Sequence, residues 1–277
     1  MENSMYKITR EIINEVVFHM IAKEKCDGVK SGFRALDYLI DGFGKGQLII
    51  IGAVAGMGKT TFACSVVDNV CVKEKKACFY FSPAASKESI VQRLIRIHGD
   101  IKYNDKDLES ISTSANEIVD SPLWIDDSPA IHIDEIIQKC REVHKIRALD
   151  LIVVDYLQLL SDEVKKENGT LAEQKRIVGK LKSLAEELQC PILLLSQLND
   201  SAFKRKRHVP IAADFPVHEV LDKYADVILI LYREYYYYMN EDMRDQAKLI
   251  VVRSKNNSCI GTHLRFDSDI PKFREWR

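Results

Sequence analysis

The chain has 277 residues, of which 46% are hydrophobic and 29% charged, and its formal net charge is −1. This composition indicates a globular protein with a sizeable core, and no apolar stretch approaches the roughly 18 residues of a membrane span, so we expect no membrane partner. Because the charge is nearly balanced, any surface for a nucleic acid must be local.

The N-terminal stretch predicts an amphipathic helix. Residues 5–24 carry apolar side chains at helical spacing with charged residues between them. Their apolar stripe must be buried either on a neighbouring subunit or on the chain's own domain, and the sequence favours neither. Glycines in the next segment, 31–47, indicate a short helix and turns. We therefore divide the chain into a linker helix, 1–28, and a main domain, 29–277.

From residue 48 onward, short apolar runs alternate with helical segments. The runs lie at 48–53, 77–82, 123–126, 151–156, 191–197 and 226–232. Continuous apolar runs separated by helices predict an α/β fold with a mostly parallel central sheet and helices on both faces. Near the C-terminus, 247–254 and 262–267 predict a β-hairpin at one edge of this sheet.

The stretch 52-GAVAGMGKTTFA-63 directly follows the first strand and predicts a phosphate-binding loop. In such loops, backbone N–H groups of a glycine-rich turn bind phosphate oxygens, a lysine reaches the β- and γ-phosphates, and a hydroxyl binds Mg²⁺. Here Gly56 and Gly58 supply the turn, Lys59 the charge and Thr60 the metal contact. The expected cofactors are therefore ATP and Mg²⁺.

The match to the general phosphate-loop pattern is not strict, because Ala53 stands in place of the first glycine. A chance glycine turn is disfavoured, because strand, loop, GKT and helix follow one another in the expected order. The residues expected to touch the nucleotide are Ala55, Gly56, Met57, Gly58, Lys59, Thr60 and Thr61.

A carboxylate is expected beside the nucleotide-bound metal. Asp155 ends the apolar run 151-LIVVD-155 and places a charge at the tip of a core strand. An aspartate there also serves as a simple strand-end cap. Together with the phosphate loop, the metal-binding role is favoured.

The cysteines give no sign of a metal or disulfide site. Seven are scattered along the chain without a CxxC pair, which indicates buried thiols in a reducing compartment. The N-terminal stretch is interrupted by charges and does not match a signal peptide. We expect a cytoplasmic protein.

With these elements in place, the sequence resembles the DnaB family of ring-shaped replicative helicases, from about residue 31 to the C-terminus. The resemblance rests on 31-SGFRALD-37, 53-AVAGMGKTTFA-63, 124-WIDDSPAIHIDEI-136, 151-LIVVDYLQLL-160, 181-LKSLAEELQCPILLLSQLN-199, 225-ADVILILYREYYY-237 and 260-IGT-262. It implies a RecA-like P-loop NTPase fold, with an ATP-binding motor domain at 29–277 that acts on single-stranded DNA as a hexameric ring.

The resemblance also implies partners. The family's N-terminal helical domain, which engages primase, has no counterpart here, and residues 5–24 resemble only the linker helix that docks on the adjacent subunit. Primase, a loader or a full-length helicase are the expected partners besides other copies of the chain.

Several further site residues come from the resemblance. Gln197 would sense the γ-phosphate, although a glutamine there equally caps a strand end, and Tyr232 and Arg233 fall where the family approaches the nucleotide base. Lys59, Asp155 and Gln197 are thus the catalytic candidates. A basic run follows the strand that ends at Gln197, and it is either a solvated loop or a set of DNA phosphate contacts. It consists of Lys204, Arg205, Lys206 and Arg207.

Three departures from the family bear on turnover. Ala84 stands where the family has the glutamate that activates water, and Asn256 stands at its arginine finger, with Lys255 beside it as a nucleotide contact. In the DNA-facing loop, 216–219 replaces the family's Arg-Glu-Ser-Gly.

Two hypotheses follow. The leading one is an ATP-dependent DNA helicase motor with weak hydrolysis. The alternative is a degenerate ATP-binding protein that acts as a regulatory or DNA-binding assembly partner. A RecA-like switch of another class is disfavoured by DYLQLL and SQLN.

Overall fold

The computed structural model describes most of the chain. The described residues are 28–129, 131–162, 171–205, 207–254 and 260–276. The predicted helix at 5–24 and three of the candidate site positions, Lys206, Lys255 and Asn256, lie outside them.

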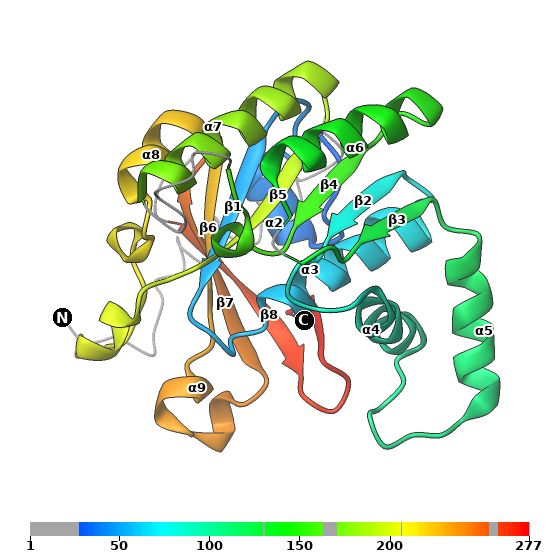
Figure 1. Ribbon diagram of the computed structural model, residues 1–277. Helices are drawn as coiled ribbons and strands as arrows, with labels where there is room; N and C mark the ends of the chain where they lie inside the picture. Colours follow the sequence, from blue (N-terminus) through cyan, green and yellow to red (C-terminus); the bar gives the residue numbers. More distant parts are fainter. Residues whose placement is uncertain (1–27, 130, 163–170, 206, 255–259, 277) are drawn as a thin grey trace.

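A nine-stranded sheet forms the centre of the molecule, in the order β3-β2-β4-β5-β1-β6-β7-β8-β9 (Figure 1). Its strands are β1 Leu48–Ala53, β2 Cys78–Phe81, β3 Leu123–Asp126, β4 Leu151–Val154, β5 Ile192–Gln197, β6 Val227–Tyr232, β7 Gln246–Arg253, β8 Ile260–Asp267 and β9 Lys272–Glu275. The first six strands in this order pair in parallel, and the last three are antiparallel. The predicted, mostly parallel sheet is confirmed.

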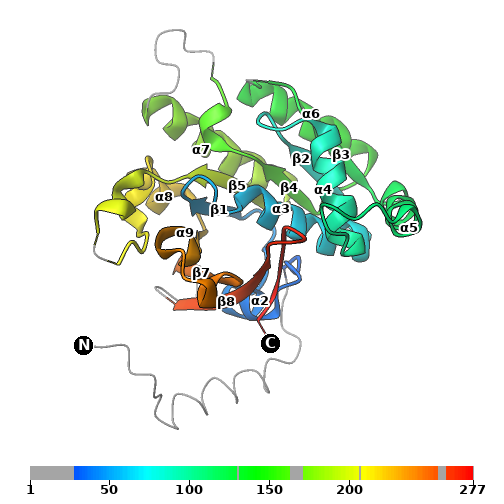
Figure 2. The same cartoon turned by 90° about the horizontal axis from the view of Figure 1, so that it is seen from below.

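Helices cover both faces of the sheet, as predicted. They are α2 Arg34–Ile40, α3 Lys59–Val67, α4 Lys87–Gly99, α5 Leu108–Val119, α6 Ile133–Ile146, α7 Leu171–Leu188, α8 His218–Tyr224 and α9 Tyr235–Tyr238. Figures 1 and 2 show α6 and α7 along one face and α3 with α4 along the other. Among the residues described, none of these helices has the length and apolar character to cross a bilayer.

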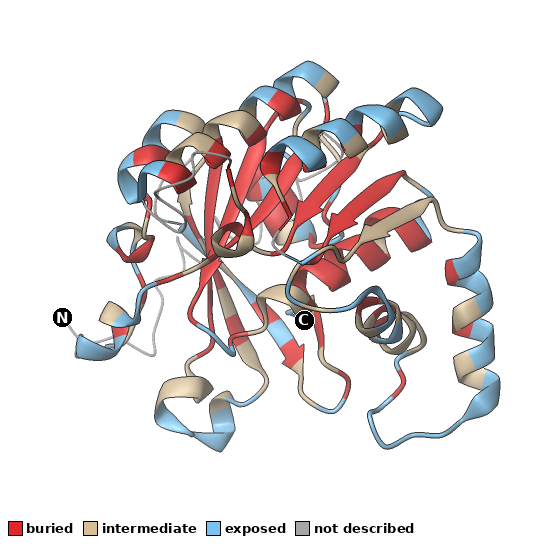
Figure 3. Ribbon diagram, viewed as in Figure 1, coloured by how far each residue is buried: buried red, intermediate tan, exposed pale blue. Residues whose placement is uncertain are grey.

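The central strands are buried on both sides, which explains their unbroken apolar runs. Every residue of β1, β4 and β6 is buried (Figure 3). Branched aliphatic side chains suit such a two-sided core because they pack on both faces of a pleated strand. The five cysteines in the described part of the chain are free and buried, in agreement with the sequence.

The C-terminal edge is larger than the predicted hairpin. Strands β7 and β8 pair as expected, and β9 adds a third antiparallel strand whose charged sequence, KFRE, gave no apolar signal. Lys272 and Arg274 pair with Asp100, at 2.7 and 2.8 Å, while Phe273 packs edge-on against Phe62 of α3. Strand β9 therefore packs against α3, the helix that begins at the phosphate loop.

Candidate nucleotide-binding site

The predicted nucleotide-binding residues meet at the carboxyl ends of the central strands. The phosphate loop follows β1, Asp155 follows β4, and Gln197 ends β5. The three strands are neighbours in the order β4-β5-β1, and Ala53 of β1 is in register with Gln197. Ligands of open α/β sheets bind at this edge, so the topology brings the catalytic candidates together.

The phosphate loop has the backbone that anion binding requires. Gly56 and Gly58 have φ angles of 80° and 97°, in the left-handed region that side chains disfavour. Gly58 is the N-cap of α3, so the free N–H groups of the first helical turn lie at the loop. Ala55 and Gly56 form its exposed tip.

Lys59 lies folded against the loop. Its Nζ donates to the carbonyl oxygens of Ala53 and Val54, at 2.9 and 3.4 Å. Burial lowers the pKa of Lys59 to about 8, and the charge of Asp155 partly opposes this shift. In the free protein, the positive charge of this ammonium is therefore only partly balanced by its neighbours, and phosphate oxygens would balance it.

Nucleotide binding is expected to take up a proton at alkaline pH. Because the Lys59 pKa is about 8 in the free protein and phosphates favour the charged form, binding at about pH 8.5 should take up roughly half to one proton. Titration calorimetry in buffers of different ionisation enthalpy measures this uptake. Near pH 7.2 Lys59 is already charged, so the proton uptake on nucleotide binding should fall towards zero. Identical binding enthalpies in all buffers at the higher pH would contradict the prediction.

Asp155 is almost fully buried and is surrounded by hydrogen-bond donors. Its Oδ2 accepts from the Tyr80 hydroxyl at 2.9 Å, and the Thr60 hydroxyl also hydrogen-bonds to the carboxylate. Burial raises the pKa of Asp155, whereas these two bonds and the charges of Lys59 and Arg93 oppose the shift. A hydroxyl and a carboxylate are the hard oxygen donors that Mg²⁺ prefers, so Thr60 and Asp155 fit the expected metal.

The backbone of Gln197 is fixed by a second glutamine. Gln158 Nε2 donates to Gln197 O at 3.2 Å and to Ser196 Oγ at 3.1 Å, and Gln197 N donates to Gln158 Oε1 at 3.1 Å. This side chain joins the segment after Asp155 to the end of β5. Sequence reasoning missed Gln158, although it lies in the DYLQLL stretch.

Tyr232 and Arg233 point into the protein. Both are buried: the Tyr232 ring stacks on Tyr237, and the Arg233 guanidinium lies 3.6 Å from the centre of the Phe266 ring. The Tyr236 ring approaches the tip of the phosphate loop, where a Cβ added at Gly56 would meet it at 3.0 Å.

The side chains of the basic run, 204–207, lie in different environments. Arg205 forms an ion pair with buried Asp214 and donates to Val209 O, so it holds its own loop together. Lys204 and Arg207 are exposed at the surface of this loop. They remain the described residues of the run with side chains available to a DNA phosphate.

Of the positions that depart from the family, Asn256 lies outside the described residues, and 216–219 lead into α8. Ala84 is exposed in the turn between β2 and α4. Glu88, the first acidic residue after it in the sequence, is exposed in the first turn of α4. Arg253, three residues before Asn256 in the sequence, donates to Asp222 O at 2.6 Å within its own chain.

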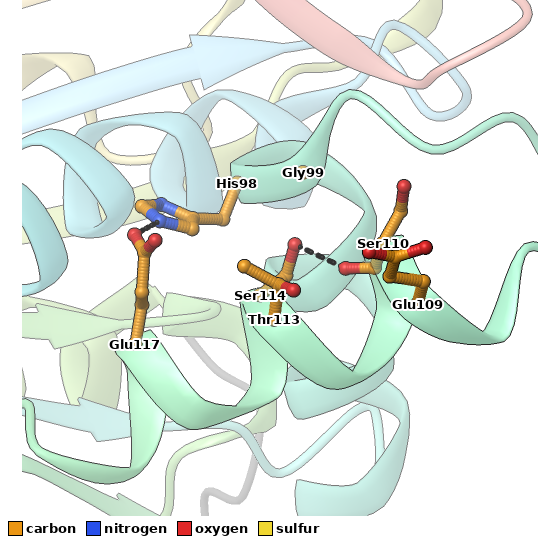
Figure 4. Close-up of a pocket in the computed structure, with 7 residues that line it drawn as sticks. All are labelled: His98, Gly99, Glu109, Ser110, Thr113, Ser114 and Glu117. Atoms are coloured by element: carbon orange, nitrogen blue, oxygen red, sulfur yellow. Dashed lines mark hydrogen bonds and ion pairs between the residues drawn. The ribbon is translucent and has the colours of Figure 1, made fainter.

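Two other polar clusters lie apart from the phosphate loop. A groove of about 370 Å³ between α4 and α5 is lined by His98, Ser110 and Glu117 among others (Figure 4). The second cluster contains His132, Asp134 and Asp162. In this cluster, Lys180 Nζ lies 2.8 Å from Asp134 and 2.9 Å from Asp162, so a side-chain ammonium already supplies the positive charge.

Comparison with known proteins agrees with this geometry. The model of the DnaB-like helicase C terminal domain matches residues 28–275. A probable replicative DNA helicase of Trieres chinensis is 30% identical over 302 residues, which cover 100% of this chain and 66% of that protein. The replicative DNA helicase DnaB of Geobacillus stearothermophilus is 30% identical over 89% of this chain and 56% of its own length. The chain thus spans less than two thirds of these relatives.

The fold has a solved counterpart. A DnaB-like replicative helicase superposes with a TM-score of 0.85 and 24% identity, over 98% of this chain and 67% of the other. The expected RecA-like α/β fold, with its mostly parallel sheet, is thereby confirmed. By fold and by sequence, the chain belongs to the DnaB-like helicase C-terminal domain family.

Proposed function

We propose that the chain is the ATP-dependent motor of a DnaB-like DNA helicase, acting on single-stranded DNA in a ring-shaped assembly. The observation that carries the proposal is the junction of phosphate loop, Asp155 and Gln197 at one sheet edge, in a chain of this family.

The residues of the site have distinct roles in this proposal. The N–H groups at the start of α3 and the Lys59 ammonium bind the phosphates, while Thr60 and Asp155 would hold Mg²⁺. Bound Mg²⁺ supplies positive charge against the phosphate oxygens during phosphoryl transfer. Gln197, with its backbone fixed by Gln158, would respond to the γ-phosphate and convey its loss to the loop that follows β5.

Hydrolysis is proposed to be slow. Ala84 can neither accept a proton nor orient water, and loss of a general base typically costs about 10²–10⁴ in rate. This substitution favours the second candidate function, an ATP-binding partner that assembles with an active helicase without rapid turnover of its own.

The proposed partners follow from the same family. The solved helicase with the similar fold was described together with its interactions with primase. We propose a hexameric ring for this chain, with the predicted linker helix, 1–28, between neighbouring motor domains, 29–277. Primase, a loader and a full-length helicase are the candidate protein partners, in the cytoplasm.

The test is ATP turnover by the purified chain, with and without single-stranded DNA, beside Lys59→Ala. Turnover that DNA stimulates and that Lys59→Ala removes is expected of a motor. Tight nucleotide binding without turnover would favour the assembly partner. Equal nucleotide binding by the chain and by Lys59→Ala would contradict both functions.

A further inference from the structure

Tyr80 is a buried residue that contacts the candidate metal site from a neighbouring strand. It lies on β2, in register with Val153 of β4. Asp155 comes two residues after Val153, and side chains two residues apart on a strand share a face. The Asp155 side chain therefore lies on the same face of the sheet as Tyr80. The fully buried Tyr80 hydroxyl donates to Asp155 Oδ2 at 2.9 Å.

The direction of this hydrogen bond is fixed by chemistry. An ionised carboxylate only accepts hydrogen bonds, so the Tyr80 proton must point at Asp155. Tyr80 is therefore the donor and Asp155 Oδ2 the acceptor of this bond.

Asp155 needs such a donor because its environment disfavours the charge. The carboxylate has 2% exposure, and burial of an ion is costly unless hydrogen bonds and opposite charges compensate it. Thr60 and Tyr80 are the two side chains that hydrogen-bond to it within the described residues. Thr60 would also hold Mg²⁺, whereas the Tyr80 hydroxyl would remain available to Asp155.

We propose that Tyr80 is a positioning residue for metal–nucleotide binding, whose hydroxyl holds the Asp155 carboxylate in place beside Thr60. The inference rests on the proposed nucleotide-binding function and assigns a role to a residue that never touches the nucleotide. Its effect should be confined to binding that depends on Mg²⁺.

The test is Tyr80→Phe, which removes one hydroxyl and keeps the ring in the core. Binding of a fluorescent ADP analogue is titrated with Mg²⁺ and, separately, measured in excess EDTA. The half-saturating Mg²⁺ concentration should rise about tenfold while binding in EDTA stays unchanged, because Asp155 loses a hydrogen bond to its charged group.

Tyr224→Phe is the matched control, since Tyr224 is a half-buried tyrosine on α8. It should bind Mg²⁺ and nucleotide as the unmodified chain does. An unchanged Mg²⁺ requirement in Tyr80→Phe overturns the inference, and so does an equal loss of binding with and without Mg²⁺, which would indicate a merely structural role. If the unmodified chain itself shows no Mg²⁺-dependent binding, the proposed function fails with it.

Discussion

Replacing Ala84 with glutamate is expected to raise kcat for ATP hydrolysis about 100-fold or more. The resemblance to the DnaB family places the water-activating glutamate at this position, and a general base contributes about 10²–10⁴ to the rate. Ala84 is exposed beyond the end of β2, the strand beside the one that leads to Asp155, so a longer side chain has room. A coupled assay of phosphate release, with and without single-stranded DNA, measures the change.

Ala84→Gln is the control for side-chain size, because glutamine is nearly as large as glutamate but has no basic carboxylate. It should leave kcat at the level of the unmodified chain. Combining Ala84→Glu with Asn256→Arg should raise turnover further, since an arginine finger contributes about 10³–10⁵ in phosphoryl-transfer enzymes. No gain in the double variant would show that the two positions are not the family's catalytic ones.

Replacing Asp214 with alanine is expected to unfold the loop between β5 and α8 locally. The buried carboxylate accepts from Ile211 N at 2.8 Å, from Ser201 Oγ at 2.5 Å and from Arg205. Burial alone raises the pKa of Asp214, but these bonds hold it below its ordinary value. Removing one partner of a buried ion pair costs about 3–5 kcal/mol, and the lower end applies because Arg205 is one third exposed.

Hydrogen exchange of the amides at 198–215 measures this local opening, and single-stranded DNA affinity should fall with it. Arg205→Ala/Asp214→Ala is the matched variant, because it removes both members of the ion pair and leaves no unpaired charge. Its loop should exchange more slowly than that of Asp214→Ala alone. Exchange in Asp214→Ala at the rate of the unmodified chain would show that the ion pair does not order the loop.

The parallel sheet and the phosphate loop could be predicted because their signals are local. Strands β1 and β5 are continuous apolar runs, and the loop is a contiguous motif whose glycines have the expected backbone angles. Strand β9 was missed because a four-residue edge strand with two pairing cations has no apolar periodicity.

The rest of the site could not be read from the sequence because it depends on distant contacts. Tyr80 and Asp155 are 75 residues apart, and their hydrogen bond exists only because β2 and β4 are neighbours. The same holds for Gln158, whose partners on β5 lie 38 and 39 residues away. The run of like charges at 204–207 suggested that all four side chains share one exposed surface. Arg205 instead pairs with a buried aspartate nine residues further along the chain.

The half-buried ammonium of Lys59 also affects the folding stability of the domain. Folding lowers the pKa of Lys59 from 10.5 to about 8, so the folded state loses stability relative to the unfolded state as the pH falls between these two values. At neutral pH the charge of Lys59 therefore destabilises the free domain. Bound phosphates would relieve this penalty, and any ligand that binds only the folded form shifts the folding equilibrium towards it. Under the proposed function, nucleotide is therefore expected to protect the domain against heat and proteolysis as well as to drive it.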